Sequence, residues 1–284
     1  MIGRSALNRG WMPAGLAATA LMLAGCSETI GGFNPSTHVA EVDADSAAQT
    51  SNAGNIASLT EVIERNPRDA AAYNTRGVVY AKLGHYSSAI EDFSHTIELD
   101  SNFSGAYTNR ALAYRQIHKD DLALQDFNQA IVVNPNDAAA YLGRGNLLRS
   151  KNDFTGALAD LNKAIQLDPE GAQAYHARGL IYQRQGDNVQ AITDFNNAID
   201  RDPFAGAPYQ ARGQSLMATG KYDAAIEDFN AALNVNANNS EAWAGLGLCY
   251  EKTNNHAKAV ESYQRAVQVN PNNSEARAGL QRLS

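Results

Sequence analysis

Cysteine, proline and runs of basic residues are scarce in this chain of 284 residues. It contains two cysteines and eight prolines, and no run of lysine and arginine stands out. The formal net charge is −7, so a nucleic acid is not an expected partner. The alternation of apolar and polar residues that is typical of half-buried strands is also missing. Together with abundant alanine, this pattern predicts a helical protein.

The patterns that carry catalytic chemistry are missing as well. The six histidines fall at unrelated positions, and none shows the H-E-x-x-H spacing of a zinc enzyme. No G-x-S-x-G elbow is present, and Gly220-Lys221 lacks the upstream glycine of a phosphate-binding loop. Cys249 lies beside Tyr250 in a predicted helix, where a small buried side chain is expected rather than a reactive thiol. The sequence therefore predicts no enzymatic activity, no metal site and no cofactor.

Residues 1–25 have the layout of a secretory signal peptide. Arg4 and Arg9 supply positive charge, an apolar run extends from Leu16 to Leu23, and small residues precede Cys26. The apolar run is too short for a lasting transmembrane helix. The signal therefore predicts export of the chain.

The Leu-Ala-Gly-Cys ending at residues 23–26 resembles the bacterial lipobox. This resemblance implies cleavage before Cys26, acylation of that cysteine and a durable membrane anchor. An ordinary signal that happens to contain a cysteine is the alternative. If Cys26 is acylated, Cys249 has no partner for an intramolecular disulfide. The residue after Cys26 is Ser27 and not an aspartate, which resembles the sorting signal for the outer membrane. The implied location is therefore the bacterial cell envelope, with the protein lipid-anchored at the outer membrane and facing the periplasm.

Residues 26–52 change in character. They are rich in Ala, Asp, Ser, Thr, Gly and Asn and show no sustained apolar period, which predicts a flexible tether behind the lipidated cysteine. In residues 53–69, by contrast, Ile56, Leu59, Val62 and Ile63 form an apolar stripe. This segment matches only the second helix of the repeat unit that follows it, and it is predicted to be a degenerate half-repeat, a single helix that covers one end of the following domain.

A 34-residue unit recurs six times between residues 70 and 273, without an insertion. The units are 70–103, 104–137, 138–171, 172–205, 206–239 and 240–273. In the first unit Tyr73, Gly77 and Tyr80 share one helical stripe, Gly84 breaks the run, and Ala89 begins a second apolar stripe. Each unit is therefore predicted to be a helical hairpin, which buries its apolar stripes only when stacked on its neighbours.

The pattern resembles the tetratricopeptide repeat (TPR) family, in which an aromatic residue, small residues, an alanine and a proline recur in this register. The resemblance implies an all-α, right-handed superhelical solenoid of six hairpins. The departures are single-site, such as Ser101 and Ala237 in place of the proline. Residues 274–284 begin a seventh first helix and are predicted to be a C-terminal cap.

Five units carry an arginine before the small residue and an aspartate before the aromatic or leucine of the second helix. The predicted structural ion pairs are Arg76–Asp92, Arg110–Asp126, Arg144–Asp160, Arg178–Asp194 and Arg212–Asp228. Each arginine and its aspartate lie equally far from the turn, which places them at one height of the hairpin. Unit six has Leu246 and Ser262 instead, and this joint loss favours a pair over a row of arginines that reads an acidic ligand.

In TPR superhelices the first helices line a concave groove, and this resemblance selects the candidate partner-binding residues. They are Asn74, Lys82, Asn109, Arg115, Asn146, Arg149, His176, Gln183, Arg184, Gln210 and Gln214. Their amides suit the backbone of an extended peptide, and a solvated face that binds nothing is the alternative. The three arginines among these residues, Arg115, Arg149 and Arg184, predict a short basic track that Lys82 would extend. Pairing of each with an acid on a neighbouring helix is the alternative.

Signal, tether and repeat array together resemble the NlpI-type TPR lipoproteins, periplasmic adaptors that bring a processing protease and peptidoglycan hydrolases together. The implied partners are proteins or extended peptides, and the membrane through the lipid anchor; a homodimer is compatible with the sequence. One alternative is a pilus or secretion assembly lipoprotein resembling TadD or the pilotins. Another is a structural spacer without a ligand.

Overall fold

The computed structural model describes residues 46–284, with side chains described from residue 54 onward. The predicted signal peptide, Cys26 and tether residues 26–45 lie outside the described residues. The described part of the chain consists of fourteen α-helices and contains no strand. They are α1 (Ser46–Arg65), α2 (Ala70–Lys82), α3 (Tyr86–Leu99), α4 (Ser104–Gln116), α5 (Asp120–Val133), α6 (Ala138–Ser150), α7 (Phe154–Leu167), α8 (Ala172–Arg184), α9 (Asn188–Arg201), α10 (Gly206–Ala218), α11 (Tyr222–Val235), α12 (Ser240–Lys252), α13 (His256–Val269) and α14 (Ser274–Arg282).

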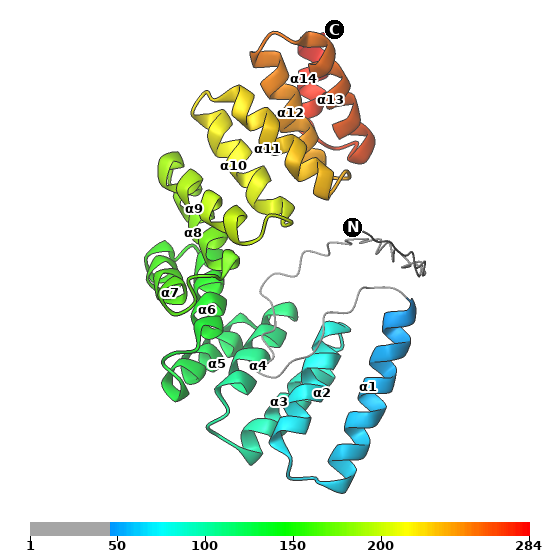
Figure 1. Ribbon diagram of the computed structural model, residues 1–284, viewed down its shortest axis with the longest axis vertical. Coiled ribbons are helices and arrows are strands. Elements are labelled where there is room, and N and C mark those ends of the chain that lie inside the picture. Colours follow the sequence, from blue (N-terminus) through cyan, green and yellow to red (C-terminus); the bar gives the residue numbers. More distant parts are fainter. Residues whose placement is uncertain (1–45) are drawn as a thin grey trace, which may run out of the picture.

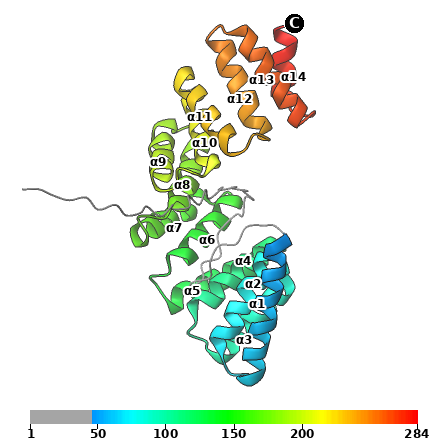
Figure 2. The same cartoon turned by 45° about the vertical axis from the view of Figure 1, so that its right-hand side comes forward.

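The helices pair into six hairpins, α2–α3 through α12–α13, which stack into a curved array (Figure 1). The first helix of each hairpin begins at the first residue of a 34-residue unit, from Ala70 to Ser240. Helix α1 packs on α2 at one end, and α14 packs on α12 and α13 at the other (Figure 2). The predicted all-α solenoid is therefore confirmed.

Each hairpin turns through a residue with positive φ at the fifteenth position of its unit. The six residues are Gly84, His118, Asn152, Gly186, Gly220 and Asn254. Glycine adopts this left-handed conformation without steric cost, and asparagine and histidine tolerate it better than most residues. One backbone conformation thus sets the same turn in all six hairpins.

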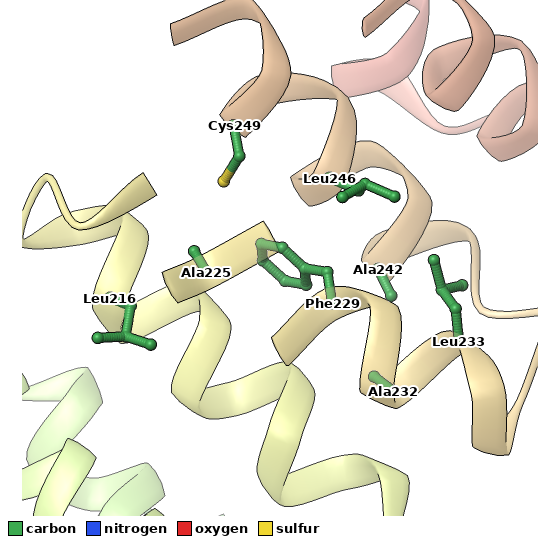
Figure 3. Close-up of a cluster of buried hydrophobic side chains, with 8 residues drawn as sticks. All are labelled: Leu216, Ala225, Phe229, Ala232, Leu233, Ala242, Leu246 and Cys249. Carbon is green, nitrogen blue, oxygen red and sulfur yellow. The ribbon is translucent and has the colours of Figure 1, made fainter. Parts of the chain in front are cut away.

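Large side chains from the second helices fill the space between consecutive first helices. Phe229 of α11 is fully buried between α10 and α12, in the cluster shown in Figure 3. A Cβ added to Gly245 of α12 would lie 2.5 Å from Cζ of Phe229, and one added to Gly213 of α10 would lie 3.1 Å from its Cε1. The absence of side chains at these positions allows the helices to approach closely on both sides of the ring.

Helix α1 begins at Ser46, seven residues before the predicted start of the end-covering helix at residue 53. Residues 46–52 carry no apolar stripe, which is why the sequence pattern places them in the tether. An apolar stripe is needed to pack a helix against a neighbour, but it is not needed to lengthen a helix that has already formed. Helix α1 packs on α2, and Ala, Ser and Gln have adequate helix propensity to extend it from there. The predicted tether is thus shortened at its C-terminal side.

Candidate functional site

The first helices form the inner side of the curved array. Each first helix contacts the first helix of the next hairpin, from α2 with α4 to α10 with α12. Within residues 46–284, no such contact joins consecutive second helices. The array is therefore tighter along its first helices and wider along its second helices, so α2, α4, α6, α8, α10 and α12 line the concave face.

The predicted arginine–aspartate pairs bridge the two helices of their hairpins. Arg144 of α6 donates from Nε and Nη2 to Oδ2 and Oδ1 of Asp160 in α7, at 2.7 and 2.8 Å. The Asp160 side chain is 7% exposed and that of Arg144 is 23% exposed. Hydrogen bonding to Asp160 raises the pKa of Arg144, whereas burial acts in the opposite direction. The forked geometry is the strong form of this interaction.

The other four pairs have the same bidentate geometry. They are Arg76–Asp92, Arg110–Asp126, Arg178–Asp194 and Arg212–Asp228, with nitrogen–oxygen distances between 2.6 and 2.9 Å. In the sixth hairpin, Leu246 and Ser262 are each 3% exposed, and Leu246 belongs to the apolar cluster of Figure 3. These five arginines are thus held by carboxylates of their own hairpins.

Each paired arginine also makes a third contact that the sequence pattern did not predict. Its Nη1 donates to a polar side chain sixteen residues earlier, in the second helix of the preceding hairpin or, for Arg76, in α1. The acceptors are Thr60, Ser94, Asn128, Asn162 and Asn196. The signal for this contact is a hydroxyl or amide residue that recurs every 34 residues. The arginines therefore connect hairpins as well as helices.

Three of the predicted groove amides are buried, which corrects their assignment to an accessible surface. Asn74, Asn109 and Asn146 are 4%, 1% and 8% exposed. Nδ2 of Asn109 in α4 donates to Oδ1 of Asn74 in α2 at 3.2 Å. Because consecutive first helices touch, their side chains fill the contact between helices instead of facing a ligand.

Two predicted groove glutamines also bond to the next hairpin. Nε2 of Gln183 in α8 donates to the carbonyl of Ala211 at 2.8 Å and to Oγ of Ser215 at 2.9 Å, both in α10. Oε1 of Gln210 accepts from Nδ2 of Asn239 at 2.6 Å. Gln214 is half-buried on α10. The amides that were expected to bind a peptide backbone therefore mainly connect the hairpins.

The three arginines among the predicted groove residues lie at the C-terminal ends of α4, α6 and α8, which are consecutive on the concave face. We refer to Arg115, Arg149 and Arg184 as the arginine track. Burial lowers the pKa of Arg115, and the charge of Arg149 lowers it further. Burial likewise lowers the pKa of Arg149, with a further contribution from Arg184. Neighbouring guanidinium groups of the arginine track thus act on each other, Arg115 with Arg149 and Arg149 with Arg184.

The arginine track has no ion-pair partner among residues 54–284, where every salt bridge involves other basic residues. Asp120 raises the pKa of Arg115 through its charge but forms no salt bridge with it. Arg184 lies over the ring of Phe154, with 5.4 Å from Cζ to the ring centroid. Lys82 is exposed on α2 and is not among the groups that shift the pKa of Arg115. The described residues thus bring the three arginines together, and Lys82 has no observed link to them.

His176 of α8 lies next to the arginine track. Its ring is tilted against that of Phe195, with 5.8 Å between centroids. Burial, together with the charge of Arg149, lowers the pKa of His176 from 6.5 to about 4. The imidazole is therefore neutral near pH 7 and can both donate and accept one hydrogen bond.

Residues 46–284 show no arrangement for metal binding and no helix suited to crossing a bilayer. No group of three His, Cys, Asp or Glu in that range could hold a metal ion. None of its helices is both long and apolar enough to span a membrane. Cys249 is fully buried in the cluster of Figure 3, and burial raises the pKa of its thiol to about 12. This thiol lacks the exposure and low pKa that a reactive cysteine needs.

Models of the tetratricopeptide repeat match about two thirds of the chain. Those described as Tetratricopeptide repeat match residues 70–103, 104–137, 172–205 and 211–274, and one described as TPR repeat matches residues 145–186. No curated protein sequence matches the chain.

Solved structures share the fold at low sequence identity. A chain of the APC/C hetero-tetramer Cut9-Hcn1 has 20% identity and a TM-score of 0.72 over 82% of this chain, which spans 46% of that longer one. YrrB, described as a TPR protein with an unusual peptide-binding site, has 21% identity and a TM-score of 0.58, with coverage of 68% and 99%. PilW, described as a type IV pilus biogenesis factor, has 18% identity and a TM-score of 0.65, with coverage of 74% and 98%.

Proposed function

Because the chain belongs to the tetratricopeptide repeat family, we propose that it is a protein-interaction scaffold that binds an extended segment of a partner protein on its concave face. The fold is typically that of a non-enzymatic scaffold, and solenoids commonly bind through their concave surface. The observation that carries the proposal is the arginine track, three cationic side chains on consecutive first helices that have no ion-pair partner among residues 54–284. The peptide-binding site of YrrB, which shares the fold, supports this type of ligand.

The proposed location is the periplasmic side of the bacterial outer membrane. Residues 1–25 would be removed, Cys26 would carry the acyl chains, and residues 27–45 would connect the anchor to α1. Within this setting the scaffold would act as an NlpI-type adaptor for a processing protease and cell-wall hydrolases. The support is the sequence of the signal and its position before a repeat array.

The location is tested by metabolic labelling with a fatty acid. The wild-type chain should incorporate the label and fractionate with the outer membrane, whereas Cys26→Ser should remain unlabelled and either stay as uncut precursor or leave the membrane. Equal labelling of both chains would contradict the lipid anchor. The repeat fold would be unaffected by that result, because it rests on helix contacts within residues 46–284.

The binding face is tested by photo-crosslinking in cells. A benzophenone amino acid is placed at Gln173 or Glu241, which are exposed on first helices, or at Val132 or Val189, which are exposed on second helices. We expect discrete crosslinked proteins from the first-helix sites. Crosslinks from the second-helix sites alone would place the partner on the convex face, and no crosslink from any site would favour the structural spacer.

A role in pilus or secretion assembly is the second candidate function. The observation that favours it is the fold similarity to PilW, a type IV pilus biogenesis factor. Identification of the crosslinked proteins by mass spectrometry separates the two candidates. Cell-wall enzymes would support the adaptor, and pilus or secretion components would support the assembly role.

A further inference from the structure

The arginine track places the charges of Arg115 and Arg149 where folding alone gives them little compensation, with Arg184 exposed beside them. Nη1 of Arg115 and Nε of Arg149 are buried and have no hydrogen-bond partner within the described residues. Their position near helix C-termini is favourable to cations, but the effect does not satisfy a buried donor. Leaving a buried charged donor unpaired costs more than this.

The five paired arginines provide a comparison within the same molecule. Arg144, eight residues before the turn, has two carboxylate oxygens and one amide oxygen as acceptors. Arg149 lies five residues later on the same helix, and the neighbouring charge that shifts its pKa is that of another cation, Arg184. The first arrangement is complete without a ligand, whereas the second lacks anionic acceptors.

We infer that the arginine track anchors an acidic segment of the partner protein, whose carboxylates accept hydrogen bonds from Arg115, Arg149 and Arg184. The inference rests on the proposed scaffold function and identifies the chemistry that its concave face recognises. Carboxylates match the flat, forked donor geometry of guanidinium groups, and their charge would offset the mutual repulsion of the three arginines.

The spacing of the helices indicates which acidic sequences fit. Packed helices lie about 8–10 Å apart, so the arginines of consecutive first helices are separated by roughly that distance along the groove. A peptide in the polyproline II conformation rises about 9 Å over three residues and returns to the same face. An acidic residue at every third position can therefore present one carboxylate to each arginine.

His176 provides a spectroscopic reporter for this binding. Burial and the charge of Arg149 both lower its pKa, to about 4, and Phe195 covers its ring. A carboxylate bound at Arg149 would add negative charge beside the imidazole and raise that pKa. An acidic segment bound elsewhere on the protein would leave the titration of His176 unchanged.

The test uses the full chain in detergent and a fluorescent peptide, blocked at both ends, with four repeats of Glu-Gly-Ser. Fluorescence anisotropy should show binding that weakens with added salt, while the matched Gln-Gly-Ser peptide should not bind. The Arg115→Ala, Arg149→Ala, Arg184→Ala triple variant should bind the acidic peptide about tenfold more weakly. Binding should also raise the pKa of His176, followed by NMR.

Two further variants separate charge from folding. Replacement of all three arginines by lysine keeps the charge, so it should retain part of the affinity even if the alanine variant melts at a lower temperature. The control replaces Lys163, Lys221 and Arg265, which lie on second helices or before one, by alanine and should bind as the wild type does. Equal binding by the wild type and the alanine triple variant, or no binding of the acidic peptide, would overturn the inference.

Two other results would overturn this inference in distinguishable ways. If the alanine triple variant still gives the wild-type crosslinks from residue 173, the scaffold proposal stands and the arginine track is not its anchor. If the wild type ignores the peptide but binds phosphatidylglycerol vesicles through the same three arginines, the anion is a lipid headgroup.

Discussion

Arg144 donates a hydrogen bond from Nη1 to Oδ1 of Asn128, a residue of the preceding hairpin, at 2.7 Å. The same guanidinium binds Asp160 within its own hairpin through Nε and Nη2. One side chain thus connects α5, α6 and α7, and the arrangement repeats from α1 to α11. Loss of an arginine should therefore affect the stacking of hairpins as well as the hairpin that contains it.

The first prediction concerns the buried pair of the third hairpin. Asp160→Ala leaves Arg144 without its carboxylate and should lower the free energy of unfolding by about 2–4 kcal/mol. Asp160→Ala combined with Arg144→Leu should cost less, because no unpaired charge remains and a leucine is accommodated at the equivalent position, Leu246. Urea denaturation measures both. Additive effects of the two single changes would contradict the coupling.

A surface pair of the same charge type serves as the control. Lys151 and Asp121 form a salt bridge in which Asp121 is 91% exposed. Exposed pairs contribute little to stability because water and salt screen them. Asp121→Ala should therefore leave the urea midpoint unchanged.

The second prediction concerns the contact between hairpins. Asn128→Ala leaves the pair of Arg144 and Asp160 intact but removes the third acceptor, and should cost about 1 kcal/mol. Asn230→Ala is the matched control, because residue 230 is also exposed and also lies sixteen residues before the position of the paired arginine. That position is Leu246 in the sixth hairpin, whose side chain has no hydrogen-bond donor. Equal urea midpoints for the two variants would show that the contact contributes nothing measurable.

The third prediction concerns the close approach of consecutive hairpins. A Cβ at Gly143 would lie 2.3 Å from Cε1 of Phe127, so Gly143→Ala must displace a fully buried ring and should cost about 1–3 kcal/mol. Gly54 lies in α1 with nothing within 4 Å of an added Cβ. Gly54→Ala should instead stabilise by up to about 1 kcal/mol, through helix propensity. Thermal unfolding of both variants tests the opposite signs.

The fourth prediction concerns the stability cost of the arginine track. Arg149→Leu removes a buried donor without a described partner and relieves repulsion from Arg115 and Arg184, so it should raise the melting temperature. It should also raise the pKa of His176 above about 4, although burial keeps that pKa below 6.5. Calorimetry and NMR titration measure the two effects. A lower melting temperature would mean that Arg149 stabilises the apo-protein.

The same histidine predicts a pH dependence of stability. Its pKa is about 4 in the folded protein, below the ordinary 6.5, so between these values the unfolded chain binds more protons. Stability should therefore fall as the pH is lowered from 6.5 to 4, by at most about 3 kcal/mol from this residue. His176→Gln should flatten that slope in urea titrations at a series of pH values. An unchanged slope would show that His176 does not carry it.

The 34-residue period by itself determined the hairpins, their turns and the pairing of Arg144 with Asp160. These features depend on positions within one unit, where the helix period and the position of the turn fix how far along the hairpin each residue lies. The period also places Arg115 and Arg149 at position 12 of their units and Arg184 at position 13 of the next, so stacking brings the three to neighbouring helix ends.

Only the tertiary structure decided which side chains on the first helices are accessible. Asn74 and Asn109 carry the amide groups expected of a peptide-binding surface, but they are buried against each other. Asn128, which accepts a hydrogen bond from Arg144, lies in another hairpin. Both results depend on the offset and curvature between consecutive hairpins. The curvature follows from how the large second-helix side chains pack against small residues on either side, a property of the contact between units that the pattern within one unit does not contain.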